Sequence, residues 1–344
     1  MNAQNHPTWS RREFLRGLTI LGGAGLLGLR PELVAAEPPP ETTTIRLTFD
    51  SEWPVLCFAP QYVAEQFLKI EGFTDVRYVS YGPEGSSTAK LFIDDEVDMT
   101  ATLHVEWIVA VDNGEPVVVL SGLHAGCLEL FANDRVHSIR ELKGKRIGVE
   151  IMGGSVHLLL SSIVAYIGLD PKRDIKWVAS NPSNWPRMLA EGEVDAILVW
   201  PPMSYDMRTR KIGHVILYTT TDEPWRHYFC CMVGARPEFV QNYPIATKRA
   251  LRAILKANQL CSMEPDRTAQ WLMDKGFASD YDYTMQTLQE VLYGAWQDYD
   301  PGDTLRFFSL RLREAGMIKS SPQEILARGT DWRFLNEIRR ELKA

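Results

Sequence analysis

Apolar positions along this chain follow two spacings: short runs typical of buried strands, and three-to-four-residue repeats typical of amphipathic helices. Both occur at residues 146–168, where a strand from Arg146 to Glu150 leads into a Gly153-Gly154 loop and Ser155 opens a helix expected to end at Gly168. One face of that helix is apolar, with Val156, Leu159, Leu160, Ile163, Val164 and Ile167. Such a junction presents free N–H groups and the positive end of the helix dipole to a small ligand.

Two other interpretations of this junction must be weighed. Its glycines do not fit the dinucleotide or phosphate-loop spacings, so nucleotide binding is not indicated. An ordinary tight turn, in which Ser155 is only the helix N-cap, would have the same sequence.

The chain also repeats itself at a distance of about a hundred residues. The first copy begins with a strand at 45–50, a loop at 51–54 and a helix at about 58–68. It continues with a strand at 76–79, a loop at 82–87, a helix to about Asp94 and the turn Glu96–Met99. In the second copy a strand at 175–178, a loop at 181–186, a helix through Leu189 and the turn Glu193–Ala196 come after the strand at 146–150. Two similar βαβ-rich lobes are the simplest explanation.

Two extended apolar segments connect these lobes. Residues 117–132 leave the first lobe, and residues 215–218 and 228–233 return to it, which predicts a two-strand hinge. From Pro244 onward the pattern becomes helical, and these helices are placed against the first lobe: 246–263, 265–275, 284–296, 303–315 and 332–342. The expected organisation is lobe I at 45–126 and 229–344, and lobe II at 127–228, after an extended leader at 37–44.

The first 36 residues have the pattern of an export signal. Ser10-Arg11-Arg12 precedes an apolar run from Gly17 to Leu29 and a small-residue cleavage site ending at Ala36, which is typical of twin-arginine export. The run is shorter than the roughly 20 apolar residues that a spanning helix needs, so cleavage and a periplasmic location without membrane insertion are expected.

Composition narrows the choice of partners. Cleavage would remove four arginines and two glutamates, a net charge of +2, and would change the formal charge from −7 to −9. An acidic body without a basic tract argues against nucleic-acid binding. Five widely spaced cysteines, 57, 127, 230, 231 and 261, do not indicate a disulfide framework or a zinc motif, so neither a metal nor a cofactor is predicted.

Several segments together resemble the nitrate/taurine/sulfonate family of periplasmic substrate-binding proteins of ABC importers. They are the export signal, the signature Glu141-Leu142-Lys143-Gly144-Lys145-Arg146-Ile147-Gly148-Val149, the Gly-Gly-Ser helix start, and Ala190–Ala196 leading to Val199-Trp200-Pro201-Pro202. The resemblance implies an α/β clamshell of the type II-like periplasmic binding protein fold. It implies a monomer without enzymatic activity, which captures a small-molecule solute between its lobes and delivers it to an ABC permease and its ATPase.

Ligand-binding candidates follow from the loops that end strands on both lobes. Hydroxyls at a helix start suit an anionic group, and tryptophans offer an apolar wall. The candidates are Trp53, Ser86, Ser87, Thr88, Thr102, His104, His124, Gly154, Ser155, His157, Trp185 and Trp200. Core packing is the alternative for each tryptophan, and structural hydrogen bonding is the alternative for each histidine.

The solute and two other roles stay open. No arginine lies at the Gly-Gly-Ser loop, and Glu106 lies near His104, so a solute with a donor group is favoured over bare nitrate. Sulfonates, carboxylates and nitrogen heterocycles remain. A thiamine-pyrimidine binding protein or synthase-like enzyme of the same fold, faintly suggested by Phe229-Cys230-Cys231-Met232, and a periplasmic sensor are the alternatives.

Overall fold

The computed structural model describes residues 37–49, 55–80 and 88–343. Residues 39–344 form one compact unit, and the fold below is that of this unit. The predicted twin-arginine signal lies outside the described residues. None of the helices in the described ranges combines the length and the apolar character that a membrane crossing requires.

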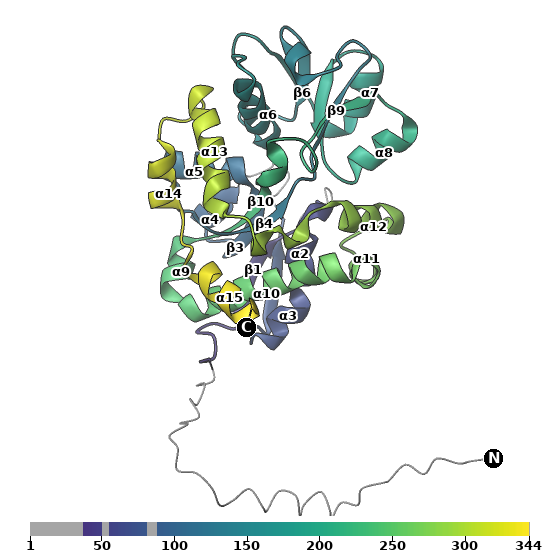
Figure 1. Cartoon of the computed structure of the whole chain (residues 1–344). Coiled ribbons are helices and arrows are strands. Elements are labelled where there is room, and N and C mark those ends of the chain that lie inside the picture. Colours follow the sequence, from purple (N-terminus) through teal and green to yellow (C-terminus); the bar gives the residue numbers. More distant parts are fainter. Residues whose placement is uncertain (1–36, 50–54, 81–87, 344) are drawn as a thin grey trace, which may run out of the picture. The chain divides into compact units, whose positions relative to one another are not determined.

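The chain from β5 to β9 forms what we call the second part (Figure 1). Its five strands make one mixed sheet in the order β7-β6-β8-β5-β9. Strand β6 pairs in parallel with β7 and β8, and β5 pairs antiparallel with β8 and β9. The bounds are β5 Glu129–Ala132, β6 Arg146–Val149, α6 Ser155–Tyr166, β7 Lys176–Ala179, α7 Trp185–Ala190, β8 Ala196–Val199, α8 Met203–Arg210 and β9 His214–Tyr218. The helix predicted to end at Gly168 ends at Tyr166, and Gly168, just beyond the C-cap Ile167, turns the chain away with a φ of +84°.

The remaining elements form the first part, which is built on two smaller sheets. Strand β1 pairs in parallel with β2, and β10 runs antiparallel between β3 and β4. The bounds are β1 Thr44–Thr48, α2 Ala59–Val63, α3 Glu65–Ile70, β2 Asp75–Val79, α4 Thr88–Ile93, β3 Met99–Leu103, α5 His104–Asn113, β4 Val118–Ala125 and β10 Phe229–Ala235. The turn predicted at Glu96–Met99 leads into β3, which begins at Met99, so Thr102 lies within β3 and His104 opens α5.

Two segments of chain cross between the parts, residues 126–128 and residues 219–228, and hydrogen bonds join them. At residues 126–128 the chain turns sharply, with φ of +70° at Gly126 and +104° at Cys127. A Cβ on Gly126 would lie 2.6 Å from the Thr220 backbone, so only glycine fits. The Cys127 N–H donates to Thr220 Oγ1 at 3.0 Å. The extended segment predicted over 117–132 is therefore two strands separated by a strained turn.

The predicted internal repeat is confirmed at atomic detail. In the first part Asp98 Oδ2 accepts from Arg46 N at 2.9 Å and from Arg46 Nε at 3.1 Å. In the second part Asp195 Oδ2 accepts from the same atoms of Arg146 at 2.9 and 3.2 Å. Each aspartate ends a Glu-Val-Asp turn and joins it to the first strand of its own copy.

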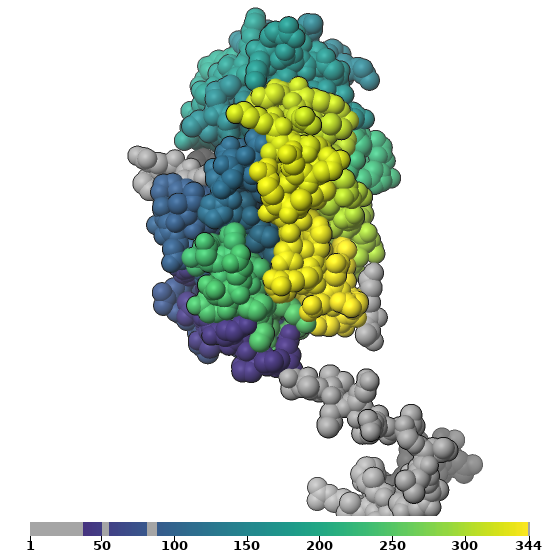
Figure 2. All heavy atoms as spheres, turned by 90° about the vertical axis from the view of Figure 1, so that its left-hand side faces the viewer, coloured from purple at the N-terminus to yellow at the C-terminus, as the bar shows by residue number. Residues whose placement is uncertain are grey.

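Most helices after β10 cover the first part and bury its sheets. Their bounds are α9 Pro237–Asn242, α10 Pro244–Met263, α11 Pro265–Asp274, α12 Tyr281–Glu290, α13 Pro301–Glu314, α14 Pro322–Gly329 and α15 Arg333–Lys343. Helix α10 packs on α2 and β4, whereas α13 contacts both α5 and α6 and thus touches both parts. Figure 2 shows the C-terminal helices as a continuous strip along one side of the molecule.

Three sequence-based boundaries differ from the structure. The helix predicted at 58–68 is two short helices, α2 and α3, that meet at Ala64. The helix predicted at 284–296 ends at Glu290, because Leu292 leaves the helical path to form a β-bridge with Ala125. Helix α14 was not predicted, although the Ser321–Glu324 capping box that starts it can be read from the sequence.

Candidate functional site

A cavity of about 680 Å³ lies between the two parts. The first part contributes the start of α4, strand β3, helix α5 and strand β10. The second part contributes the loop after β6, the start of α6 and the ends of β7 and β8. The lining residues that matter below are Cys57, Thr88, Thr102, Glu106, Cys127, Glu150, Gly154, Ser155, Trp200, Cys230 and Cys231.

The loop between β6 and α6 forms one wall of this cavity. Gly154 is the N-cap of α6 and provides no side-chain cap, and Ser155 is the first helical residue. The interpretation of Ser155 as an N-cap is therefore wrong, and its hydroxyl is free to bond elsewhere. A Cβ on Gly154 would lie 2.5 Å from Glu150 Oε1 and 2.8 Å from Ile151 Cγ2, so a larger residue here would force one or both of these side chains to move.

Glu106 on α5 is the centre of a hydrogen-bonded group that joins the two parts. The Ser155 hydroxyl donates to Glu106 Oε1, and Thr88 Oγ1 donates to Glu106 Oε2 at 3.2 Å. Burial raises the pKa of the Glu106 carboxyl, and hydrogen bonds from Ser155, Thr102 and Thr88 oppose that rise. Helices α5 and α6 are thereby connected across the cavity through one buried carboxyl group.

Glu150 supplies a second carboxyl group, which sequence reasoning did not select. Its Oε1 accepts from the Val156 N–H at 3.1 Å, and its Oε2 is buried without a partner among the described residues. Burial raises the pKa of this carboxyl as well, and the negative charge of Glu106 adds to the effect. The position directly after β6 was the available signal, since strand ends are where α/β sheets place ligand groups.

The predicted tryptophans occupy different environments. Trp200, directly after β8, is partly exposed and lines the cavity. Trp185 is fully buried, donates from Nε1 to Ser180 Oγ at 3.1 Å and packs edge-on against Trp200. Trp200 is therefore a cavity wall, and Trp185 supports it from the core.

The three predicted histidines are all buried, and none of them lines the large cavity. His104 Nδ1 donates to the Cys230 carbonyl at 2.8 Å, and burial lowers the pKa of its ring to about 4. His157 Nδ1 accepts from the Gly153 N–H at 3.0 Å and so holds the loop before α6. His124 lies on β4, behind the cysteines of the cavity floor.

Trp53, Ser86 and Ser87 lie outside the described residues. The structure therefore brings together six of the twelve predicted residues around the cavity or its floor: Thr88, Thr102, Gly154, Ser155, Trp200 and, behind the floor, His124.

The residues that line the cavity are acidic in character. Among the described lining residues there are three glutamates, 106, 115 and 150, and no lysine, arginine or histidine. The two internal segments outside the described residues, 50–54 and 81–87, also contain none of these three residue types in the sequence. An inorganic anion would therefore find hydroxyls and N–H groups here but no opposing positive side chain.

Comparison with known proteins identifies one family. A sequence model described as the NMT1-like family matches residues 39–273. A nitrate/nitrite binding protein, NrtA of a Nostoc species, is 22% identical over 292 residues, which cover 78% of this chain and 64% of that relative. The match thus spans less than two thirds of the relative's length.

Solved structures show the same fold. The periplasmic nitrate-binding protein NrtA from Synechocystis superposes with a TM-score of 0.71 at 16% identity, covering 89% of this chain and 90% of that chain. A putative periplasmic sulfonate-binding protein from Methylobacillus flagellatus gives a TM-score of 0.64 at 20% identity, with coverage of 87% and 94%. The fold predicted from the sequence, that of the periplasmic binding proteins, is confirmed.

Proposed function

We propose that this chain, which belongs to the NMT1-like family, is the solute-binding component of an ABC importer. In this role it captures a small organic molecule in the cavity between its two parts and delivers it to a membrane permease and its ATPase. The fold supports this proposal, and so do relatives named as nitrate- and sulfonate-binding proteins. Periplasmic location, twin-arginine export with cleavage near Ala36 and a monomeric state belong to the same proposal.

The two parts act as lobes in this mechanism. Lobe I comprises 45–126 and 229–344, lobe II comprises 127–228, and the crossing segments between them serve as the hinge. The hydrogen bond from Ser155 to Glu106 joins the lobes across the cavity. It therefore stabilises the closed arrangement of α5 against α6.

The observation that carries the solute class is the acidic lining of the cavity, whose described residues include no lysine, arginine or histidine. Glu106 and Glu150 offer acceptor oxygens, and Trp200 offers an aromatic face. A solute with hydrogen-bond donors on an apolar or aromatic body satisfies both. A donor would pair with Glu150 Oε2, which has no partner in the part of the chain that the structure describes, and the body would cover Trp200. An amino-substituted nitrogen heterocycle fits better than nitrate or a simple sulfonate.

The contacts follow from this placement. Thr88, Thr102, Ser155 and the Gly154 backbone provide polar contacts, Trp200 provides stacking, and Trp53, Ser86 and Ser87 remain predicted contacts. His104, His157 and Trp185 are assigned supporting roles behind the cavity, because each is buried and hydrogen-bonded within the protein.

Native mass spectrometry of the protein purified without denaturation is the first test. A retained small molecule would support the role and identify its class. A thermal-shift panel then compares nitrate, an alkanesulfonate, a dicarboxylate and an aminopyrimidine. At a concentration 100 times its Kd, a true solute stabilises the folded state by about 2.7 kcal/mol.

Matched variants make the panel specific to the cavity. We expect Glu106→Gln and Trp200→Ala to reduce the shift caused by the donor-bearing solute, and Glu141→Gln, an exposed carboxyl outside the lining, to leave it unchanged. Stabilisation by nitrate or sulfonate that is equal in the wild type and Glu106→Gln would contradict the proposed solute class. No response to any solute, with no retained ligand, would contradict the binding role.

A further inference from the structure

Four of the five cysteines gather around one histidine at the floor of the cavity. Cys57 comes from the turn Leu56–Phe58, Cys127 from the strained turn between β4 and β5, and Cys230 and Cys231 from β10. All four thiols are free and buried, and all four residues line the cavity. Because these segments are far apart in sequence, the spacing of the cysteines along the chain does not predict the cluster.

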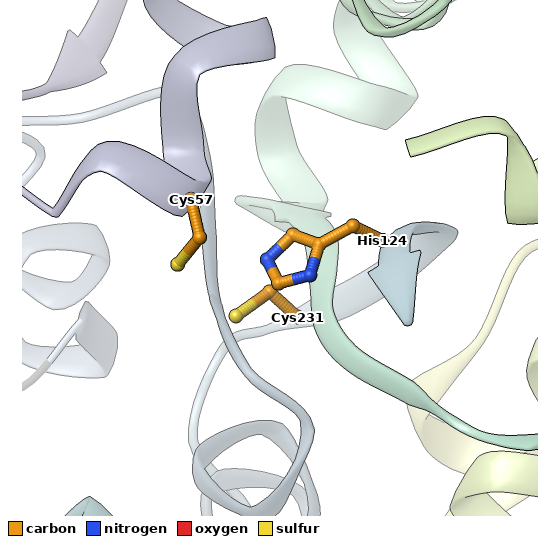
Figure 3. A group of neighbouring side chains, drawn as sticks. All are labelled: Cys57, His124 and Cys231. Atoms are coloured by element: carbon orange, nitrogen blue, oxygen red, sulfur yellow. The ribbon is translucent and has the colours of Figure 1, made fainter. Parts of the chain in front are cut away.

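His124 lies at the centre of this group. It is fully buried, and neither of its ring nitrogens has a hydrogen-bond partner within the described part of the chain. Cys231 is its register partner across β4 and β10. Figure 3 shows the imidazole ring directed toward Cys57 and Cys231. A buried imidazole without partners is costly, so the position calls for a group that the nitrogen can bind.

The distances fit coordination of one ion. Two triads share His124: one with Cys57 and Cys231, the other with Cys127 and Cys230. Within each triad the ligand atoms lie within 4.8 Å of one another. Within one triad the Cys127 and Cys230 sulfurs are 3.4 Å apart, and the Cys230 and Cys231 sulfurs, which belong to different triads, are 3.8 Å apart. Two sulfurs bound tetrahedrally at a Zn–S length of about 2.3 Å would lie roughly 3.8 Å apart.

We propose that His124 and the thiols around it form a binding site for a single thiophilic metal ion, Zn²⁺ or Cu⁺, at the cavity floor. Soft sulfur donors with one imidazole select these ions over Mg²⁺ or Ca²⁺. Two thiolates and a neutral imidazole around Zn²⁺ carry no net charge, which suits a buried place. On binding, two S–H bonds break, two S–Zn bonds form, and two protons pass to solvent.

This site does not depend on the import role, because its ligands are distinct from Glu106, Glu150 and Trp200. It does affect the cavity, since the four thiol-bearing residues line it. An ion held here with an open coordination position would face the space between the two parts.

The test uses the full chain without a histidine tag, reduced and handled anaerobically. Zn²⁺ affinity is measured by competition with a chromophoric chelator, Cu⁺ affinity with a Cu⁺-specific chelator, and Co²⁺ serves as a spectroscopic probe through its thiolate charge-transfer bands. We expect one ion per chain, with His124→Ala weakening binding by more than the 10- to 100-fold that loss of a second-shell partner costs.

Single variants from each triad locate the ligands. Loss of affinity in Cys57→Ser, in Cys127→Ser or in both supports the site and identifies which triad binds. Cys261→Ser is the control, because Cys261 is a buried thiol on α10 outside both triads. Melting temperatures of the metal-free variants separate lost coordination from lost folding.

Two results would overturn the proposal. One is wild-type affinity in His124→Ala, Cys57→Ser and Cys127→Ser alike, which would place any bound metal elsewhere. The other is failure of the reduced protein to bind either ion.

Discussion

The hydrogen bond between Ser155 and Glu106 allows a quantitative test of how the two parts are held together. Ser155→Ala, Glu106→Ala and the double variant form a thermodynamic cycle, whose coupling energy isolates this contact from the cavity and packing effects of each substitution. The Ser155 hydroxyl donates to the Glu106 carboxyl group, and this hydrogen bond is charge-assisted when the carboxyl is ionised. Hydrogen bonds to charged groups contribute about 1.5–3 kcal/mol.

The pH dependence of this coupling follows from the raised pKa of Glu106. The coupling is measured at pH 8 and at pH 4, and an ionised carboxyl, which the higher pH favours, is expected to give about 1.5–3 kcal/mol. At pH 4 the carboxyl is protonated, the contact becomes a neutral hydrogen bond, and the coupling falls to about 0.5–1.5 kcal/mol. Because the native pKa is raised above that of the unfolded chain, the native state binds more protons in between, and the Glu106 contribution to stability falls as pH rises.

Urea unfolding of the four proteins at both pH values measures these energies. Ser162→Ala is the control variant, since Ser162 is a buried serine on the same helix whose hydroxyl donates to the Leu159 carbonyl. It should show no coupling to Glu106→Ala. A Ser155–Glu106 coupling below about 0.5 kcal/mol at pH 8, or one that grows on acidification, would refute the reasoning.

Three further predictions concern single sites. Burial alone would raise the pKa of Asp195, but hydrogen bonds from Arg146 bring it down to about 2. The contribution of the ionised Asp195 to folding stability is therefore complete above pH 4 and is lost as pH falls toward 2. In acid titrations, the difference in unfolding free energy between wild type and Asp195→Asn should narrow over that range. Trp185→Ala should lower the free energy of unfolding in urea by about 3–5 kcal/mol, as for other buried aromatics, and Trp200→Ala should lower it much less. Equal losses would show that Trp200 is a core residue. Gly154→Ala should cost about 1–3 kcal/mol through overpacking against Glu150, and an unchanged midpoint would show that the loop yields.

Much of the fold could be predicted from local patterns. The strand at 146–149, the helix that Ser155 opens and the Gly168 stop depend on apolar spacing and on the conformational freedom of one glycine. The repeat was visible because each copy carries the same Glu-Val-Asp turn. The structure adds the reason for that turn, since its aspartate binds both the backbone and the side chain of an arginine in the first strand.

The site was less predictable, because its residues are selected by position in space. Ser155 was identified from its helix start, but its partner Glu106 lies 49 residues earlier on another helix. Trp185 and Trp200 look alike in the sequence, and burial alone separates a core residue from a cavity wall. Glu150 was missed although it directly follows β6, because only the folded loop shows that its carboxyl lies at the cavity.

The sequence by itself determined the two α/β copies, the helical C-terminal region and the family, since periodicity, turn residues and motifs act over short stretches of chain. Only the tertiary structure decided which side chains meet. The antiparallel pairing of β4 with β10 places Cys231 beside His124, more than a hundred residues away in sequence, and the turn after β4 adds Cys127. Contacts of this kind depend on strand register and chain crossing, which no local pattern encodes.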